Sequence, residues 1–159
     1  MIRILFVCHG NICRSPMAEF VMKDLMRRNG LQDSYHIESC ATSSEELGHD
    51  MYPPAKDELD RRGVPYSRRS ARRMTKDDYD RFDMIVAMDH QNLRNLRPFV
   101  GDDPDHKVSL MLSCRRGPGR GRPLVYRGFL CDVQGRAEGM RRHPQGDVPV
   151  SLTAHPNLL

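Results

Sequence analysis

The chain has 159 residues, 38% of them hydrophobic, and its 25 basic and 21 acidic residues give a net charge of +4. This length suits one domain with a single hydrophobic core, and the first apolar run, residues 2–7, is too short for a signal peptide or a membrane span. The five cysteines have irregular spacing, which argues against a disulfide framework, so we expect a cytoplasmic protein with free thiols and no membrane partner.

Apolar runs and periodic segments alternate as far as residue 113. They predict strands at 2–7, 35–43, 83–89 and 107–113, and helices at 15–30, 51–63, 74–82 and 90–99. The first helix is expected to begin with Ser15 as its N-cap and Pro16 in its first position, and the third with Thr75 as its cap. Strands that alternate with helices indicate βαβ units, a parallel sheet and an α/β fold.

The C-terminal segment, residues 114–159, breaks this pattern. It holds seven Gly and five Pro and has no sustained helical period, which predicts mostly irregular structure. Its eight Arg and three acidic residues give a net charge of +5, whereas residues 1–113 have a net charge of −1. A uniformly basic nucleic-acid binder would not be divided in this way. We therefore expect an α/β domain over 1–113, an aberrant tail over 114–159, and no nucleic-acid partner.

The sequence "FVCHGNICRSPMAEF" at residues 6–20 carries the main chemical signal. Cys8 directly follows the first predicted strand, and ligands of parallel sheets bind at the carboxyl ends of strands. A loop from there to a helix start forms an anion cradle from backbone N–H groups and the helix dipole. Gly10 permits unusual dihedral angles and close approach, and Asn11 tolerates the left-handed region. Arg14 offers a guanidinium that matches two phosphate oxygens.

This arrangement favours the thiolate form of Cys8 and places it for in-line attack on a bound phosphate, giving a phosphocysteine intermediate. The hydroxyl of Ser15 is expected to donate to that sulfur. The alternative reading is a buried structural cysteine beside a surface arginine. Cys114 and Arg120 have the same spacing, but no helix pattern opens after them, so we interpret that second match as a coincidence.

The sequence closely resembles the low-molecular-weight protein tyrosine phosphatase family over residues 1–113. The segments that carry the resemblance are "VCHGNICRSPMAE", "ESCATSSEELG", "PPAKDELDRRGV", "ARRMTKDDYDRFDMIVAMDHQNLRNL" and "KVSLML". It implies a four-stranded parallel sheet flanked by helices, no metal and no organic cofactor. It also implies hydrolysis of phosphotyrosine esters, with phosphotyrosine proteins or small aryl phosphates as partners.

The resemblance also implies roles for individual residues. Cys8 is the nucleophile, and Arg14 binds and stabilises the transferring phosphoryl group. Cys13 matches the second cysteine of the family, which traps an oxidised nucleophile as a reversible disulfide. The residues expected to surround the phosphate are His9, Gly10, Asn11, Ile12, Cys13, Arg14 and Ser15.

Several positions separate this chain from related families or from the usual pattern. Ile12 favours phosphotyrosine, because similar protein-arginine phosphatases carry Thr there, and residues 74–97 lack the cysteines of similar arsenate reductases. Glu45, beside Glu46, replaces a frequent aromatic at the substrate rim. The two carboxylates either favour basic or cationic substrates or are simply solvated loop residues. Arg69 replaces a frequent His, which puts the hydrogen bonds of that His in doubt.

The expected general acid is missing. The family supplies it from an Asp-Pro-aromatic-Tyr loop after the fourth strand, and residues 114–159 contain no such loop. The Asp-Pro at 102–104 precedes that strand and is interpreted as a turn. Asp132 and Asp147 lack the motif around them.

A change of reading frame accounts for this absence. Residues 121–130, "GRPLVYRGFL", admit codons that, read one base later, give Ala-Asp-Pro-Trp-Tyr-Thr-Gly-Asp-Phe, which contains the missing loop. The residues that follow can be shifted in the same way to a sequence that resembles the closing helix of the family. This predicts a frame change near 113–114. A coding sequence whose shifted frame does not spell the loop would refute it.

The sequence therefore leaves three hypotheses. The first is a phosphatase that retains its nucleophile and phosphate loop but is impaired in protonating the leaving group. The second is a catalytically weak module that binds phosphate or phosphotyrosine. The third is a nonfunctional product that folds poorly, which a cooperative melt would exclude.

Overall fold

The computed structural model describes residues 1–111, and the predicted alternation of strands and helices is confirmed there. The strands are β1 (Ile2–Cys8), β2 (Tyr35–Ala41), β3 (Met84–Ala87) and β4 (Val108–Leu110). The helices are α1 (Arg14–Arg28), the short 3₁₀ helix η1 (Gln32–Ser34), α2 (Pro53–Arg61), α3 (Lys76–Arg81) and α4 (His90–Val100). The predicted tail and the second cysteine–arginine pair lie outside the described residues.

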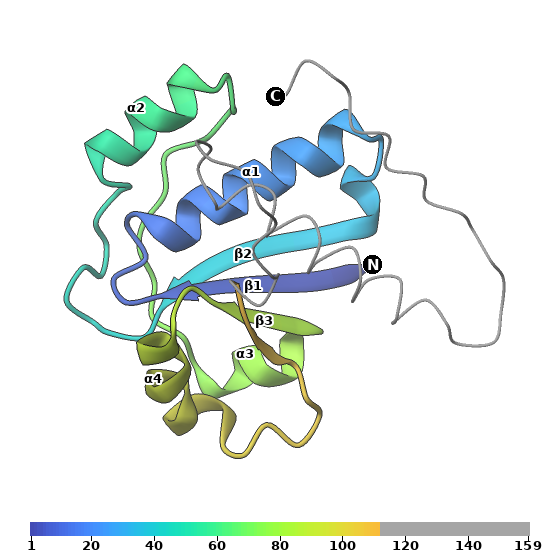
Figure 1. The fold of residues 1–159 in the computed structure, drawn as a ribbon, viewed down its shortest axis with the longest axis vertical. Coiled ribbons are helices and arrows are strands. Elements are labelled where there is room, and N and C mark those ends of the chain that lie inside the picture. The colour runs from blue at the N-terminus through green and yellow to red at the C-terminus, as the bar shows by residue number, and fades with distance from the viewer. Residues whose placement is uncertain (112–159) are drawn as a thin grey trace, which may run out of the picture.

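All four strands form one parallel sheet, as predicted, and their order in it is β2-β1-β3-β4. Strand β1 lies in the centre and pairs with β2 from Ile2 to Cys8 and with β3 from Ile4 to Val7. Because the strands are parallel, the loops after β1, β2 and β3 gather at one end of the sheet (Figure 1).

Strand β1 is apolar throughout because both faces of the sheet are covered. Ile4, Phe6 and Cys8 belong to a core on the α1 side, whereas Leu5 and Val7 belong to a core on the opposite side. Figure 1 shows α1 over one face and α3 and α4 over the other. A third cluster packs α2 against α1. Side chains that alternate between two buried faces explain why the run reads as continuously hydrophobic.

The predicted start of α1 is wrong by two residues. The helix begins at Arg14 with Cys13 as its N-cap, and the Cys13 side chain makes no capping hydrogen bond. Ser15 lies inside the first turn and is fully buried, because its hydroxyl binds Cys8 and Asn11 instead of the helix end. The predicted cap of α3 is correct, since Thr75 and Asp78 form a reciprocal capping box.

The segment 69–74 lies beside the end of β2 and beneath the loop that follows β1. Ala41 N–H donates to Arg72 O at 2.8 Å, and Met74 N–H donates to Ala41 O at 2.9 Å. Ala71 N–H donates to His49 O at 2.8 Å, which ties the segment to the loop after β2. These bonds fix the backbone from which Arg69 and Arg72 extend.

Candidate active site

The loop 9–13 joins the end of β1 to the start of α1 and lies at the carboxyl end of the sheet. Two backbone bonds tie it to the loop after β2: Thr42 N–H donates to Cys8 O at 2.9 Å, and Ser43 N–H donates to His9 O at 3.0 Å. Tyr52 N–H donates to Ile12 O at 2.7 Å. Backbone hydrogen bonds from the segment between β2 and α2 therefore stabilise the conformation of this loop.

Cys8 lies at the base of this loop with 3% of its surface exposed. Its sulfur accepts a hydrogen bond from Asn11 N–H at 3.3 Å and lies 3.0 Å from the Ser15 hydroxyl. Both groups are able to donate to a sulfur anion, and the N-terminus of α1 adds positive potential. The Ser15 hydroxyl thus lies within hydrogen-bonding distance of the Cys8 sulfur, as the sequence predicted.

Asn11 holds the loop in shape. Its φ is 59°, in the left-handed region that the sequence predicted for it, and 1% of its surface is exposed. Its side-chain N–H groups donate to Ser15 Oγ and Ser39 Oγ, each at 2.9 Å. Its side-chain oxygen accepts from Arg69 Nη2 at 2.7 Å and from the Arg72 backbone N–H at 3.2 Å. All four hydrogen-bonding positions of this amide are therefore filled.

The Ser15 hydroxyl has two acceptors within reach. Asn11 donates to Ser15 Oγ, and the hydroxyl proton can go to Cys8 Sγ at 3.0 Å or to Cys40 O at 3.4 Å. While Cys8 is a thiol, either group of the Cys8–Ser15 pair can donate. A Cys8 thiolate has no proton, so toward that anion Ser15 is the donor. These contacts occupy the hydroxyl inside the site and explain why it does not cap the helix.

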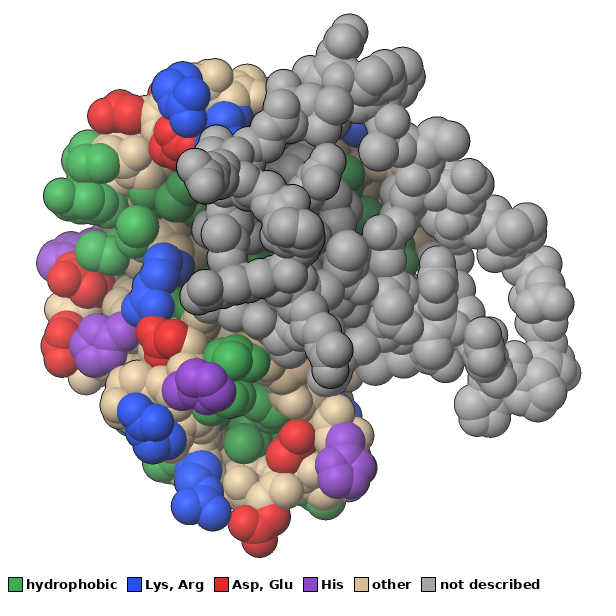
Figure 2. Space-filling view, viewed as in Figure 1, with side chains coloured by type: hydrophobic (Ala, Val, Ile, Leu, Met, Phe, Trp, Pro, Cys, Tyr) green, Lys and Arg blue, Asp and Glu red, His purple; other side chains and the backbone are tan. Residues whose placement is uncertain are grey.

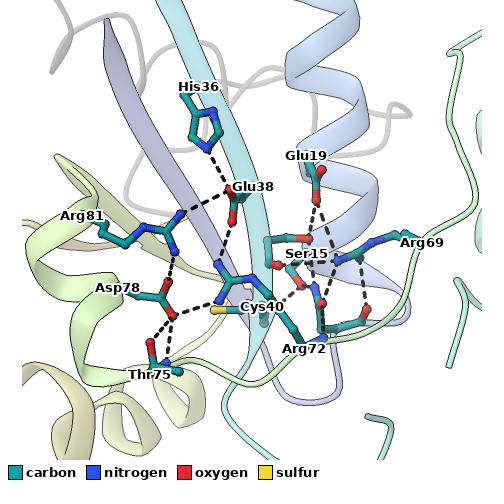
Figure 3. Close-up of polar contacts among 12 residues, drawn as sticks. Ser15, Glu19, His36, Glu38, Cys40, Arg69, Arg72, Thr75, Asp78 and Arg81 are labelled. Atoms are coloured by element: carbon teal, nitrogen blue, oxygen red, sulfur yellow. Dashed lines mark hydrogen bonds and ion pairs between the residues drawn. The ribbon is translucent and has the colours of Figure 1, made fainter. Parts of the chain in front are cut away.

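A polar network continues from Asn11 into the protein (Figure 3). Ser39 Oγ accepts from Asn11 and donates to Glu19 Oε2 at 2.6 Å. Lys23 pairs with the other oxygen of Glu19 at 2.6 Å. Figure 3 shows Arg69 directed toward Ser15 and Glu19, while Arg72 is directed toward Glu38 and Asp78. The sequence analysis assigned no role to Glu19 or Ser39. Glu19 lies within the quoted segment 6–20 but on the helix beyond the loop, and 28 positions separate Ser39 from its partner Asn11.

Arg14 lies at the mouth and is half exposed. Its Nη1 donates to Asp89 Oδ2 at 2.5 Å, which leaves its other N–H groups available to a phosphate. Asp89 also caps α4 by accepting from Asn92 N–H at 2.7 Å. Burial favours a higher pKa for Asp89, but the hydrogen bonds from Arg14 and Asn92 outweigh it and lower the pKa. Asp89 is therefore an anion that orients Arg14 and is unsuited to donate a proton.

The two rim glutamates reach the loop, each with a histidine partner. Glu45 lies 3.0 Å from His9 Nε2, and Glu46 lies 2.7 Å from His49 Nδ1. Figure 2 shows histidine and acidic side chains next to one another on the side where Figure 1 places the loop between β2 and α2. A Cβ on Gly10 would lie 2.9 Å from Glu46 Cγ, so the absence of a side chain at Gly10 permits the predicted close approach. Gly10 is not among the residues with positive φ, so its backbone conformation does not account for a glycine at this position.

The described part of the chain contains two further thiols, Cys13 and Cys40. Burial and the neighbouring Cys8 both raise the pKa of Cys13, and Arg14 opposes them more weakly. Burial raises the pKa of Cys40, which is fully buried. Cys8, Cys13 and Cys40 are all free thiols.

The Asp-Pro at 102–104 forms a turn before β4, as predicted. Asp103 has a φ of 51°, and its carboxylate accepts from Tyr79 Oη at 2.9 Å, Lys107 N–H at 2.9 Å and Val108 N–H at 3.1 Å. Asp103 therefore stabilises the turn that leads into β4, and its carboxylate is already engaged in hydrogen bonds rather than free for catalysis. Over residues 1–111 there is no group of three or more His, Cys, Asp or Glu side chains that could hold a metal ion. No helix in that range is long and apolar enough to cross a membrane.

The fold and the site define a class of α/β protein in which the loop between the first strand and the first helix surrounds a cysteine at the end of the strand. A family model described as low molecular weight phosphotyrosine protein phosphatase matches residues 3–120. The low molecular weight protein-tyrosine-phosphatase YfkJ of Bacillus subtilis is 39% identical over 101 residues, which cover 64% of this chain and 65% of that protein. The human low molecular weight phosphotyrosine protein phosphatase is 42% identical over 93 residues, which cover 58% of each chain.

The crystal structure of YfkJ from Bacillus subtilis matches with a TM-score of 0.75 at 28% identity and covers 91% of this chain and 98% of that one. The aligned sequence spans less than two thirds of either curated relative. Because the family model matches well over half of the residues, the chain belongs to the low molecular weight phosphotyrosine protein phosphatase family.

Proposed function

We propose that this protein hydrolyses phosphotyrosine and other aryl phosphate monoesters through a phosphocysteine on Cys8. The observation that carries the proposal is the position of the Cys8 sulfur, 3.3 Å from the Asn11 N–H and 3.0 Å from the Ser15 hydroxyl at the base of the loop. Family membership supports the same substrate class. Free thiols in the described residues suit a reducing cytoplasm.

The first step forms a bond from the Cys8 sulfur to phosphorus and breaks the bond from phosphorus to the aryl oxygen. Arg14 binds the equatorial phosphate oxygens through its guanidinium, and the loop N–H groups and the α1 dipole stabilise the added charge. In the second step, water attacks the phosphocysteine, the sulfur–phosphorus bond breaks, and phosphate and the thiolate are released. Ser15 donates a hydrogen bond to the sulfur as it leaves.

The leaving aryl oxide requires a proton, and we propose that this chain lacks the acid that normally supplies it. Asp89 is held as an anion by Arg14, and the Asp103 carboxylate accepts three hydrogen bonds. Positioned acids contribute about 10²–10⁴-fold. The expected deficit is largest for esters with basic leaving groups, such as phosphotyrosine peptides, and smallest for p-nitrophenyl phosphate, whose leaving group is weakly basic.

Two rates on purified full-length protein test this proposal. We expect turnover of p-nitrophenyl phosphate that Cys8→Ser abolishes, and a much lower kcat with a phosphotyrosine peptide. Comparable, family-like kcat values on both substrates would refute the missing acid. Absence of turnover, together with phosphate binding that survives Cys8→Ser, would favour the alternative function, a catalytically weak phosphate-binding module.

We further propose that Glu45 and Glu46 form a substrate rim that favours basic or cationic substrates. Both carboxylates lie at the edge of the loop, where they meet the groups that flank a bound phosphate. Phosphotyrosine peptides with flanking Lys or Arg should show a lower KM than peptides with flanking Glu, and Glu45→Gln with Glu46→Gln should remove that difference. An unchanged KM ratio in the double variant would show that the carboxylates are only solvated loop residues.

A further inference from the structure

Arg69 is a buried cation whose contacts are mostly with the phosphate loop. Its side chain is 12% exposed and comes from the segment 69–74, beneath the loop. Its Nη1 donates to Asn11 O at 3.2 Å, and its Nη2 donates to Asn11 Oδ1 at 2.7 Å. A weaker bond of 3.5 Å reaches Ser39 O. One guanidinium therefore holds both the backbone and the side chain of the residue with the left-handed conformation.

A purely structural role would be to neutralise the buried Glu19, with which Arg69 forms an ion pair, but the hydrogen bonds of Arg69 go elsewhere. Arg69 Nη2 lies 3.9 Å from Glu19 Oε2, beyond hydrogen-bonding distance, whereas the same nitrogen lies 2.7 Å from Asn11 Oδ1. Glu19 already receives hydrogen bonds from Lys23 at 2.6 Å and Ser39 at 2.6 Å. The geometry of the guanidinium is therefore matched to Asn11.

Arg69 affects Cys8 indirectly, through its hydrogen bonds to Asn11. The Asn11 N–H that faces the Cys8 sulfur belongs to the same residue whose carbonyl and side chain Arg69 holds. Left-handed conformations of residues other than glycine cost free energy and persist when surrounding contacts impose them. Loss of Arg69 would leave the Asn11 carbonyl and one side-chain acceptor position unpaired and free the loop to relax.

The positive charge of Arg69 also favours an anion in the loop. The charged and titratable groups that interact with Arg69 are Glu19, Cys8, Arg72 and Asp50. Burial lowers the pKa of the Arg69 guanidinium, and the neighbouring acids and Cys8 oppose that shift, but arginine remains charged at any pH that the protein tolerates. The loop thus lies between a cation at its mouth, Arg14, and a permanent cation beneath it.

We propose that Arg69 is a positioning residue that fixes Asn11 and, through it, the N–H facing the Cys8 thiolate, and that its buried charge stabilises that thiolate from beneath the loop. The proposal rests on the proposed phosphatase function for its catalytic meaning. The state of the thiol, however, is measurable without turnover, so the two fail separately.

The experiment compares the parent with Arg69→Met, Arg69→Lys and the matched control Arg68→Met, all as full-length protein. Arg68 is the exposed neighbouring arginine, so its loss removes a charge of the same sign without touching the loop. The readouts are the rate of Cys8 alkylation by iodoacetamide between pH 6 and 9, followed by peptide mass spectrometry, and kcat and KM for p-nitrophenyl phosphate. Fragment-ion sequencing assigns the adduct to Cys8 or to Cys13, which lie only five residues apart.

At pH 6.5 we expect Arg69→Met to slow Cys8 alkylation by about tenfold and to lower kcat by at least as much, since loss of one well-placed stabilising charge or bond is worth about a factor of ten. Arg69→Lys keeps the charge but not the fork, so it should keep most of the alkylation rate and still lose kcat. Arg68→Met should match the parent in both.

Folded Arg69→Met protein with the parental alkylation profile would overturn the proposal. If Arg69→Met does not melt cooperatively, Arg69→Lys provides the test. A kcat and an alkylation rate both equal to those of the parent would show that the paired guanidinium bonds to Asn11 have no positioning role. Equal losses in Arg68→Met would also overturn it, since the effect would then come from general surface charge.

Discussion

Replacing Asn11 by Ala should cost both stability and activity. The change removes four side-chain hydrogen bonds, to Ser15, Ser39, Arg69 and Arg72, from a site that is 1% exposed. Each such bond contributes about 0.5–1.5 kcal/mol net, and an alanine at a φ of 59° adds about 1 kcal/mol. Allowing for non-additivity, the free energy of unfolding should fall by about 4 kcal/mol.

The assay is urea denaturation of the parent, Asn11→Ala and Asn11→Gly, with the slope m as a check that unfolding remains cooperative. Glycine tolerates the left-handed conformation, so Asn11→Gly should recover only about 1 kcal/mol of the loss. kcat for p-nitrophenyl phosphate should fall about 10²-fold in both variants, because the N–H facing Cys8 is no longer fixed. Full recovery of stability in Asn11→Gly would refute the reasoning, since the loss would then be conformational only.

Three further changes test other parts of the site. Asp89→Asn keeps a good helix cap but removes the charge that orients Arg14, so kcat should fall several-fold while the free energy of unfolding changes by less than about 1 kcal/mol; an unchanged kcat would exclude the orienting role. Burial favours a higher pKa for Asp78, but hydrogen bonds from a guanidinium and a backbone N–H outweigh it and lower the pKa below the ordinary 3.8. The stabilisation from the Asp78 carboxylate is therefore present above about pH 4 and is lost as the pH falls through its lowered pKa. In urea titrations, the stability of Asp78→Asn should be closest to that of the parent at the lowest pH. A stability difference that stays constant from pH 7 to pH 3 would contradict this. Gly10→Ala places a Cβ 2.9 Å from Glu46 Cγ and should displace that side chain, which weakens any preference for basic peptides while the melting temperature changes little; an unaltered KM ratio would contradict the contact.

The sequence predicted the sheet and its helices because burial on two faces and helix periodicity are local signals. The run 2–7 has the composition of a buried strand, and the Thr75 cap of α3 is visible within the four residues 75–78. The start of α1 was wrong because Ser15 has the character of a cap but its hydroxyl is used by Cys8 and Asn11. A competing tertiary contact overrode a local preference, as happens at functional sites.

Cys8, Asn11 and Arg14 could be predicted as site residues because they lie within one short loop. Their supports could not, since Arg69 is 58 positions from Asn11 and Asp89 is 75 positions from Arg14. Nothing in the local sequence marks these side chains as partners of the loop, and only the family resemblance drew attention to position 69. The parallel order of the strands brings Asp89, after β3, next to the loop after β1. The backbone bonds of the segment 69–74 to the end of β2 and to the loop after it place Arg69 there.

The proposed mechanism is tested most directly by trapping the phosphocysteine intermediate on Cys8. The protein is mixed with p-nitrophenyl phosphate, quenched in acid during turnover, digested and examined by mass spectrometry. We expect a phosphoryl adduct on the peptide that contains Cys8, and no adduct in Cys8→Ser. Turnover that persists in Cys8→Ser, or turnover in the parent with the phosphoryl group found elsewhere, would contradict it.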